Sequence, residues 1–202
     1  MISSWFSNTV QILNPETKTI TDSYQDFLVP LNTVAFNKDI IVAELVGHHV
    51  VRRNIESGST EVLMSGIAVP TGLATNNKEL FAADWLTGSI FQLLTEGISL
   101  HPPLPIISGL YQPEGMAMDN QGRLQVVETG KKHLVRIDPT NPVIEVLADN
   151  LSVGLQGISG YPPNWLLSSI VVDECGRITL TQDLDNSLLR ITPDADIPGQ
   201  CN

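Results

Sequence analysis

The feature that most constrains this fold is a repeat in the sequence, with a period of roughly 40 to 50 residues. The clearest copy, residues 111–139, reads as three runs of alternating apolar and polar residues separated by two turns rich in Gly, Asn and Lys. Such alternation, bounded by turn residues, is typical of antiparallel strands. The same pattern of alternating runs and turns recurs at residues 30–44, 70–84 and 168–183. The second half of another copy lies at the start of the chain, at residues 4–12.

Units of this length, with about four short strands each, predict an all-β fold of the β-propeller type. One four-stranded sheet cannot bury both of its faces alone, whereas neighbouring sheets bury them against each other. We expect a single domain over residues 1–193 and a polar tail at 194–202. The domain should hold three complete four-stranded blades and a partial blade at each end, with boundaries at 1–27, 28–67, 68–110, 111–165 and 166–193.

The two partial blades leave strand edges open. The first should contribute two strands, near residues 9–13 and 17–21, and the last should contribute three. Both ends supply a third strand, so they do not complete one sheet between them. Bare edges pair readily with other chains, so we expect either an open arc of blades or self-association in which a second copy covers the edges.

Composition restricts the partners. The chain has 202 residues, of which 42% are hydrophobic, and this is enough for a sizeable core. The net charge of −11 argues against nucleic acid and anionic membranes, because both repel a negative surface. It is compatible with a small neutral or cationic ligand or with a protein partner. The sequence shows no signal peptide and no apolar run long enough for a membrane helix, which predicts a cytoplasmic protein if Met1 is the true start.

Several polar residues belong to the repeat itself. Four acidic residues close the second strand of successive copies and are expected to accept backbone hydrogen bonds from the following turn: Glu44, Asp84, Glu128 and Asp183. His49 and His133 each follow five residues after one of these acids, and no zinc-ligand spacing is present. The chain's two cysteines, Cys175 and Cys201, are expected to be isolated thiols rather than a bridge.

The residues that open the first strand of each copy form a predicted axial ligand-binding site, made of Asn32, Thr71, Glu114 and Ser168. Oxygen ligands from Asn32 and Glu114 suit a hard divalent cation such as calcium, which takes about 6 to 8 oxygens. The alternative is that these side chains are hydrogen-bonded turn residues at strand starts. A loop around Tyr161 and Trp165 is a second candidate, as a lid or contact surface, because loops on rigid scaffolds often carry function.

Residues 112–119 (QPEGMAMD) and 134–138 (LVRID) carry a resemblance to a known superfamily. They resemble six-bladed propellers of the gluconolactonase, regucalcin and strictosidine-synthase-like group and their NHL-repeat relatives. The resemblance implies an incomplete six-bladed propeller, truncated at its N-terminal side. It also implies an axial divalent metal, usually calcium, held here by Asn32 and Glu114, with Glu114 as the catalytic residue. Thr71 and Ser168 depart from the family's stronger ligands.

Two functions follow. The first is a binding or interaction propeller with a degenerate axial site. The second is a calcium-dependent lactone or ester hydrolase, in which the ion polarises the carbonyl and activates water. Because fold alone does not choose between them, the choice depends on the chemistry of the site.

Overall fold

The computed structural model describes residues 1–157 and 168–192. The chain divides into two compact units, Met1–Ser108 and Gly109–Asn202, each of which is described by itself. Every described element of regular structure is a β-strand or a turn between strands. The strands form five antiparallel sheets, three with four strands and two with three. The prediction of an all-β propeller with three complete blades and a partial one at each end is therefore confirmed.

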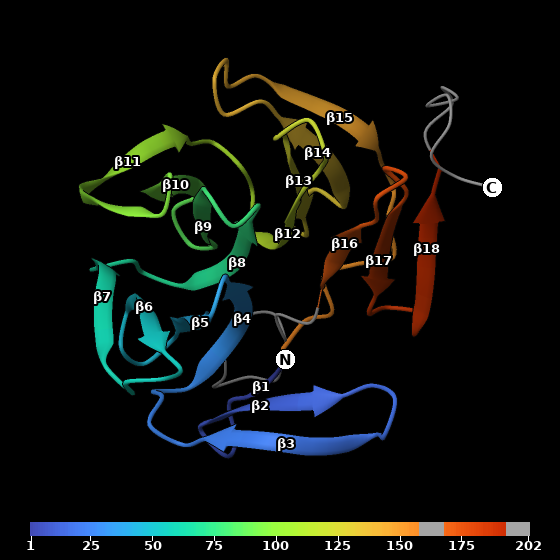
Figure 1. Ribbon diagram of the computed structural model, residues 1–202. Helices are drawn as coiled ribbons and strands as arrows, with labels where there is room; N and C mark the ends of the chain where they lie inside the picture. The colour runs from blue at the N-terminus through green and yellow to red at the C-terminus, as the bar shows by residue number, and fades with distance from the viewer. Residues whose placement is uncertain (158–167, 193–202) are drawn as a thin grey trace. The chain divides into compact units, whose positions relative to one another are not determined.

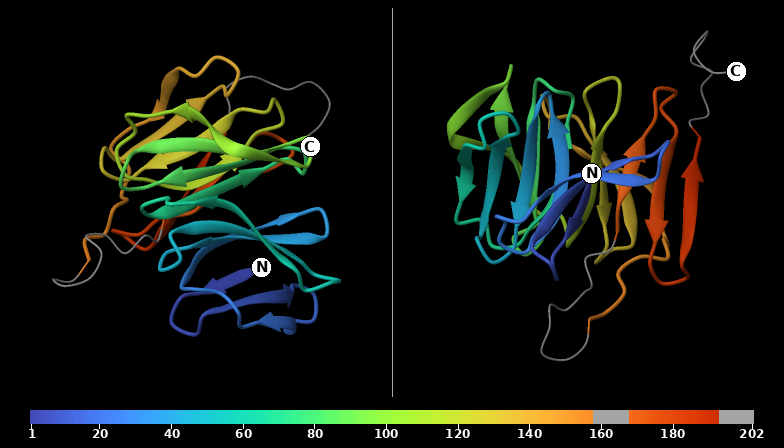
Figure 2. Two further views of the ribbon diagram at one scale, coloured as in Figure 1. Left: turned by 90° about the vertical axis from the view of Figure 1, so that its left-hand side faces the viewer. Right: turned by 60° about the horizontal axis from the view of Figure 1, so that its bottom comes forward.

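Unit 1 contains the first three sheets (Figure 1). Their strands, in chain order, are β1 (Ile2–Ser4), β2 (Thr9–Asn14) and β3 (Thr19–Tyr24); β4 (Pro30–Phe36), β5 (Asp39–Glu44), β6 (His49–Asn54) and β7 (Thr60–Ser65); β8 (Pro70–Thr75), β9 (Leu80–Asp84), β10 (Ser89–Thr95) and β11 (Ile98–Ile107). Each sheet is a simple meander, and both views of Figure 2 show the three sheets, coloured blue to green, side by side.

Unit 2 contains the other two sheets. Their strands are β12 (Pro113–Met118), β13 (Leu124–Glu128), β14 (His133–Ile137) and β15 (Ile144–Ala148), then β16 (Ile170–Val172), β17 (Ile178–Gln182) and β18 (Ser187–Ile191). The last sheet has the three strands that the sequence predicts. In the described chain, β18 lies at its edge with no fourth strand beside it.

The N-terminal sheet corrects one expectation, because it has three strands rather than two. The additional strand, β1, pairs with β2 through Ser4 and Thr9, and it corresponds to the end of a second strand in the other blades. With only three residues, Ile-Ser-Ser, it is too short to show a period of two.

The second strand of each complete blade is buried on both faces. In β5, Ile41 and Ala43 join a core shared with the third sheet, whereas Ile40 and Val42 join a core shared with the first. This explains the continuous apolar run, since a strand covered on both sides has no polar face. In unit 2, Val127 of β13 packs in the same manner with Ile178 and Leu180 of β17.

The turn between the second and third strands shares one backbone feature in all five sheets. Its fourth residue lies in the left-handed region, with φ between 49° and 67°; the residues are Asn8, His48, Gly88, Lys132 and Asn186. Asn and Gly adopt this conformation readily, which is why they recur at this place in the repeat. The repeat seen in the sequence is therefore a repeat of backbone geometry.

Candidate functional site

The four repeated acidic residues anchor the chain. The Asp84 carboxylate accepts from the backbone N–H groups of Ala68 and Val69, each at 3.1 Å. Asp183 accepts from Gly154 and Leu155, each at 2.9 Å. These donors lie in the loop that enters the blade.

Glu44 accepts a hydrogen bond from the backbone N–H of Leu28, and Glu128 accepts one from that of Tyr111, each at 2.8 Å. The structural role is confirmed, but the donors come mainly from the entering loop rather than from the following turn. Asp84 also accepts from that turn, through Leu86 at 3.1 Å.

Two of these acids pair with the repeat histidines. Glu44 contacts His49, and the Glu128 carboxylate lies 3.9 Å from Nδ1 of His133. The described residues hold no group of three or more His, Cys, Asp and Glu side chains that could bind a metal ion. In two blades, therefore, the repeat histidine lies beside the repeat acid.

Glu114 is the predicted axial residue with the most unusual environment. Its side chain is buried at the start of β12. Oε1 accepts from the Thr129 hydroxyl at 2.9 Å, and Oε2 accepts from the Ser168 backbone N–H at 3.1 Å. Burial raises the pKa of this carboxyl, and the nearby Asp183 charge adds to the rise, whereas the bonds from Ser168 and Thr129 oppose it.

Ser168 meets Glu114 across 54 residues of sequence. Its hydroxyl is buried and makes no hydrogen bond of ordinary geometry with the described residues, although it lies close enough to the carboxyl to favour the charged form. Gly115 permits this approach, since a Cβ there would lie 2.9 Å from the Ser168 carbonyl oxygen. The structure therefore brings two of the four predicted axial residues together within unit 2.

The other two predicted axial residues lie in unit 1. Thr71 directly follows the proline of its strand, as Glu114 does, and its hydroxyl donates to the Ala83 carbonyl at 3.4 Å. Asn32 is one position further along, because Leu31 is the residue that follows Pro30. The Asn32 Oδ1 accepts from the Thr33 backbone N–H at 2.8 Å.

These side chains offer little to a calcium ion. Glu114 and Asn32 lie in different units, and the oxygens of both already accept hydrogen bonds. Calcium takes about 6 to 8 oxygen ligands, and each unit supplies one of the predicted pair. The remaining ligands of an ion would have to come from backbone carbonyls or water, so no catalytic step is derived through it.

Two sequence predictions fall near the chain's last sheet. The loop residues Tyr161 and Trp165 lie outside the described residues. Cys175 is disulfide-bonded, so the expectation of an isolated thiol there is wrong. Spacing gave no indication of this pairing, because a turn residue can reach any segment that the fold brings beside it. Cys201 also lies outside the described residues.

Sequence analysis missed a row of exposed apolar side chains in unit 1, which we call the turn row: Phe6, Val46 and Leu86. Their exposed fractions are 85%, 62% and 64%, and each occupies the second position of the turn after the second strand. In unit 2 the same position holds Gly130 and Leu184, and Leu184 is 42% exposed. The repeat alignment could have revealed the turn row, since its three residues fall at one frame of the repeat.

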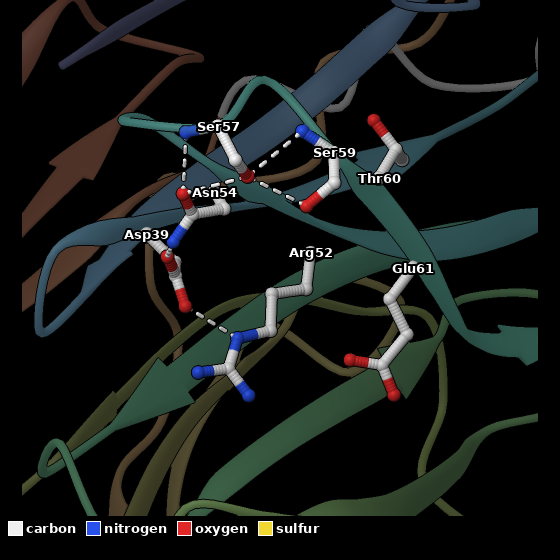
Figure 3. Close-up of a pocket in the computed structure, with 7 residues that line it drawn as sticks. All are labelled: Asp39, Arg52, Asn54, Ser57, Ser59, Thr60 and Glu61. Carbon is white, nitrogen blue, oxygen red and sulfur yellow. Dashed lines mark hydrogen bonds and ion pairs between the residues drawn. The ribbon is translucent and has the colours of Figure 1, made fainter.

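Sequence analysis also missed a polar hollow on the second sheet, which Figure 3 shows. It has a volume of about 370 Å³ and is lined by Asp39, Arg52, Asn54, Ser57, Ser59, Thr60 and Glu61. Local sequence gives no sign of it, because its residues come from three strands and a turn. Nothing in the described part of the chain forms a helix that could span a membrane.

Comparison with known proteins gives the fold alone. No protein-family model matches the sequence, and no curated protein does. The predicted kinship with gluconolactonase-like propellers therefore stays a prediction.

Solved structures do match. Virginiamycin B lyase from Staphylococcus aureus matches over 94% of this chain with 14% identity and a TM-score of 0.61. A catalytically inactive variant of that lyase, with quinupristin, matches over 94% with 16% identity and a TM-score of 0.64. A chain of a nidogen/laminin complex matches over 92% of this chain with 13% identity and a TM-score of 0.63. This chain spans 74% of that chain.

The fold is a β-propeller. This chain spans 64% and 61% of the two lyase chains, less than two thirds of their length.

Proposed function

We propose that this chain is a non-catalytic β-propeller module that binds a partner protein through the turn row of unit 1. The observation that carries the proposal is the repetition of exposed apolar residues at one turn position in three successive sheets. These side chains contribute nothing to the cores between the sheets. Exposed apolar groups that recur on one surface mark interaction sites in soluble proteins.

In the third sheet, the repeated acid holds the turn that carries the row. The Asp84 carboxylate bonds the backbone of the turn through Leu86 and the entering loop through Ala68. In the second sheet, Glu44 bonds Leu28 of the entering loop. A preorganised surface loses little conformational entropy when a partner binds. The same bonds occupy the carboxylates, which favours binding over catalysis.

The structural relatives are consistent with either class of function. One match is a nidogen/laminin complex, and another is a lyase with quinupristin. At 13% and 16% identity they support the scaffold and leave function to the site. The turn row favours a protein with an apolar surface as the partner.

Peptide display tests the proposal. Binders selected on the wild-type chain should carry apolar residues and should lose about tenfold or more in affinity for the triple variant Phe6→Ser, Val46→Ser, Leu86→Ser.

The matched control replaces three exposed apolar residues on outer strands, Val62→Ser, Ile98→Ser and Leu104→Ser, and should bind as the wild type does. Binders that treat the two triple variants alike would refute the turn row as the binding surface. Sedimentation of both variants tests whether a second copy is the partner.

A calcium-dependent lactone or ester hydrolase is the second candidate, and one observation favours it. Glu114 is a buried carboxyl with a raised pKa, and such groups cluster at functional sites. In this case Glu114 and Asn32 would hold the ion, which would polarise a carbonyl when bound.

A thermal melt with calcium and then with chelator tests this candidate. Binding at about 100 times the dissociation constant adds about 2.7 kcal/mol to the free energy of unfolding, a rise in Tm of about 5 to 11 °C. The rise should vanish in Glu114→Gln. A Tm that ignores calcium and chelator would remove the hydrolase from consideration and leave the turn row untouched.

A further inference from the structure

The polar hollow on the second sheet is built around a fixed ion pair. Nε of Arg52 donates to Oδ2 of Asp39 at 2.5 Å, and the other Asp39 oxygen accepts from Nδ2 of Asn54 at 2.7 Å. The Arg52 guanidinium also lies over the Phe36 ring, 5.4 Å from its centroid, and bonds the Gly97 carbonyl at 3.4 Å. Asp39 and Arg52 neutralise each other and form a rigid floor.

The carboxylate of Glu61 also lines the hollow, but it takes no part in the ion pair between Asp39 and Arg52. It stands opposite Arg52 in the register of β6 and β7, but Arg52 bonds Asp39 instead. The equivalent cross-strand pair in unit 2 behaves differently: Arg136 and Glu145 face each other in the same manner and form an ion pair at 3.4 Å. The hollow therefore carries one carboxylate more than its floor can neutralise.

Glu61 is held in place by residues of the third sheet. Its Oε1 accepts from the Ser99 hydroxyl at 2.6 Å, and it lies 3.8 Å from Nε2 of His101. Ser99 and His101 belong to β11, so the third sheet positions this side chain over the second. Figure 3 shows Glu61 across from Asp39, with Arg52 between them.

The remaining lining groups are hydrogen-bonding side chains without an aromatic ring. Ser57, Ser59 and Thr60 present hydroxyl groups, and those of Ser57 and Ser59 lie 2.8 Å apart. A quaternary ammonium ligand is normally held by aromatic faces, whereas an ammonium with N–H donors needs oxygen acceptors such as these.

We propose that the hollow binds a small ligand that carries a primary ammonium group, such as a diamine. The ammonium donates to the Glu61 carboxylate and to the hydroxyl oxygens, and the Asp39–Arg52 pair forms the base of the site. A volume of about 370 Å³ is within the range of small-molecule pockets, roughly 300 to 1,000 Å³. The net charge of −11 on the chain attracts cations to it. This site is separate from the turn row.

Titration of the intact chain with 1,4-diaminobutane, followed by NMR, tests the proposal. Chemical-shift changes should be concentrated at residues 52–61 and 99–101. Glu61→Gln should weaken binding about tenfold or more, because the neutral amide oxygen of Gln accepts a weaker hydrogen bond from the ammonium than the carboxylate does. Glu145→Gln, the matched control in unit 2, should leave the dissociation constant within about twofold.

Three results would overturn the proposal: equal weakening in the two variants, equal binding of tetramethylammonium, or shifts spread over all acidic surfaces. Glu61 is 44% exposed in its side chain, so Glu61→Gln should fold, and its Tm measures this directly.

Discussion

Replacement of Asp84 by Ala tests whether the repeated carboxylates are structural. The side chain is 3% exposed and accepts from three backbone N–H groups at 3.1 Å, those of Ala68, Val69 and Leu86. Alanine removes every acceptor and leaves these donors without partners. Hydrogen bonds to charged groups contribute about 1.5 to 3 kcal/mol each, and water can reach the donor at the turn.

The expected loss in the free energy of unfolding is about 3 to 5 kcal/mol, which corresponds to a Tm lowered by about 6 to 20 °C for a chain of this size. Asp84→Asn should recover less than half of the loss, because its NH₂ group faces a donor. Calorimetry or circular dichroism during heating measures both variants. Asp22→Ala is the control, since Asp22 is exposed on strand β3 and should change stability by no more than about 0.5 kcal/mol.

A Tm for Asp84→Ala within about 2 °C of the wild type would refute the reasoning. In that case the Asp84 carboxylate would not be needed for stability and could serve a ligand. The structural role of the equivalent acids in the other sheets would then need the same test.

Three further predictions concern single residues. Because burial raises the pKa of Glu114, its contribution to stability is fully present below the ordinary value of 4.5 and is lost as the pH rises through the raised value. The Tm of Glu114→Gln, measured relative to that of the wild type, should therefore increase as the pH is raised from about 4 to about 8. A difference in Tm that stays constant over this range would contradict the prediction. Gly115→Ala should lower the free energy of unfolding by about 1 to 3 kcal/mol, since its Cβ would meet the Ser168 backbone at 2.9 Å; an unchanged Tm would mean that the two strands are further apart. Lys132→Gly should raise stability by about 0.5 to 1 kcal/mol in a urea titration, because φ is 58° there and Gly88 fills the same position in the third sheet; a loss would show that the side chain makes a needed contact.

Much of the fold could be predicted because the propeller is built from local rules. Alternation predicted the strands, clusters of Gly and Asn predicted the turns, and the period predicted the number of sheets. The apolar run Ile40 to Ala43 does not alternate, and only the structure shows the reason, which is that this strand is covered on both faces. The short β1 was missed because three residues carry no period. Within each blade, contacts are close in sequence, so sequence pattern and structure agree.

The sequence by itself determined the blades, the anchoring acids and the repeated turns, because each of these depends on residues fewer than about 20 positions apart in most blades. Only the tertiary structure decided which side chains meet across blades. Ser168 bonds Glu114 across 54 residues, and Ser99 bonds Glu61 across 38.

Glu61 and Glu145 stand in the same register opposite an arginine, yet one is ion-paired and the other faces a hollow. The difference arises because Arg52 forms its ion pair with Asp39 and because Ser99 of the neighbouring sheet bonds Glu61. A repeat fixes the position of each backbone in its blade, but the charge of a site depends on which neighbours the packing of the blades brings to it.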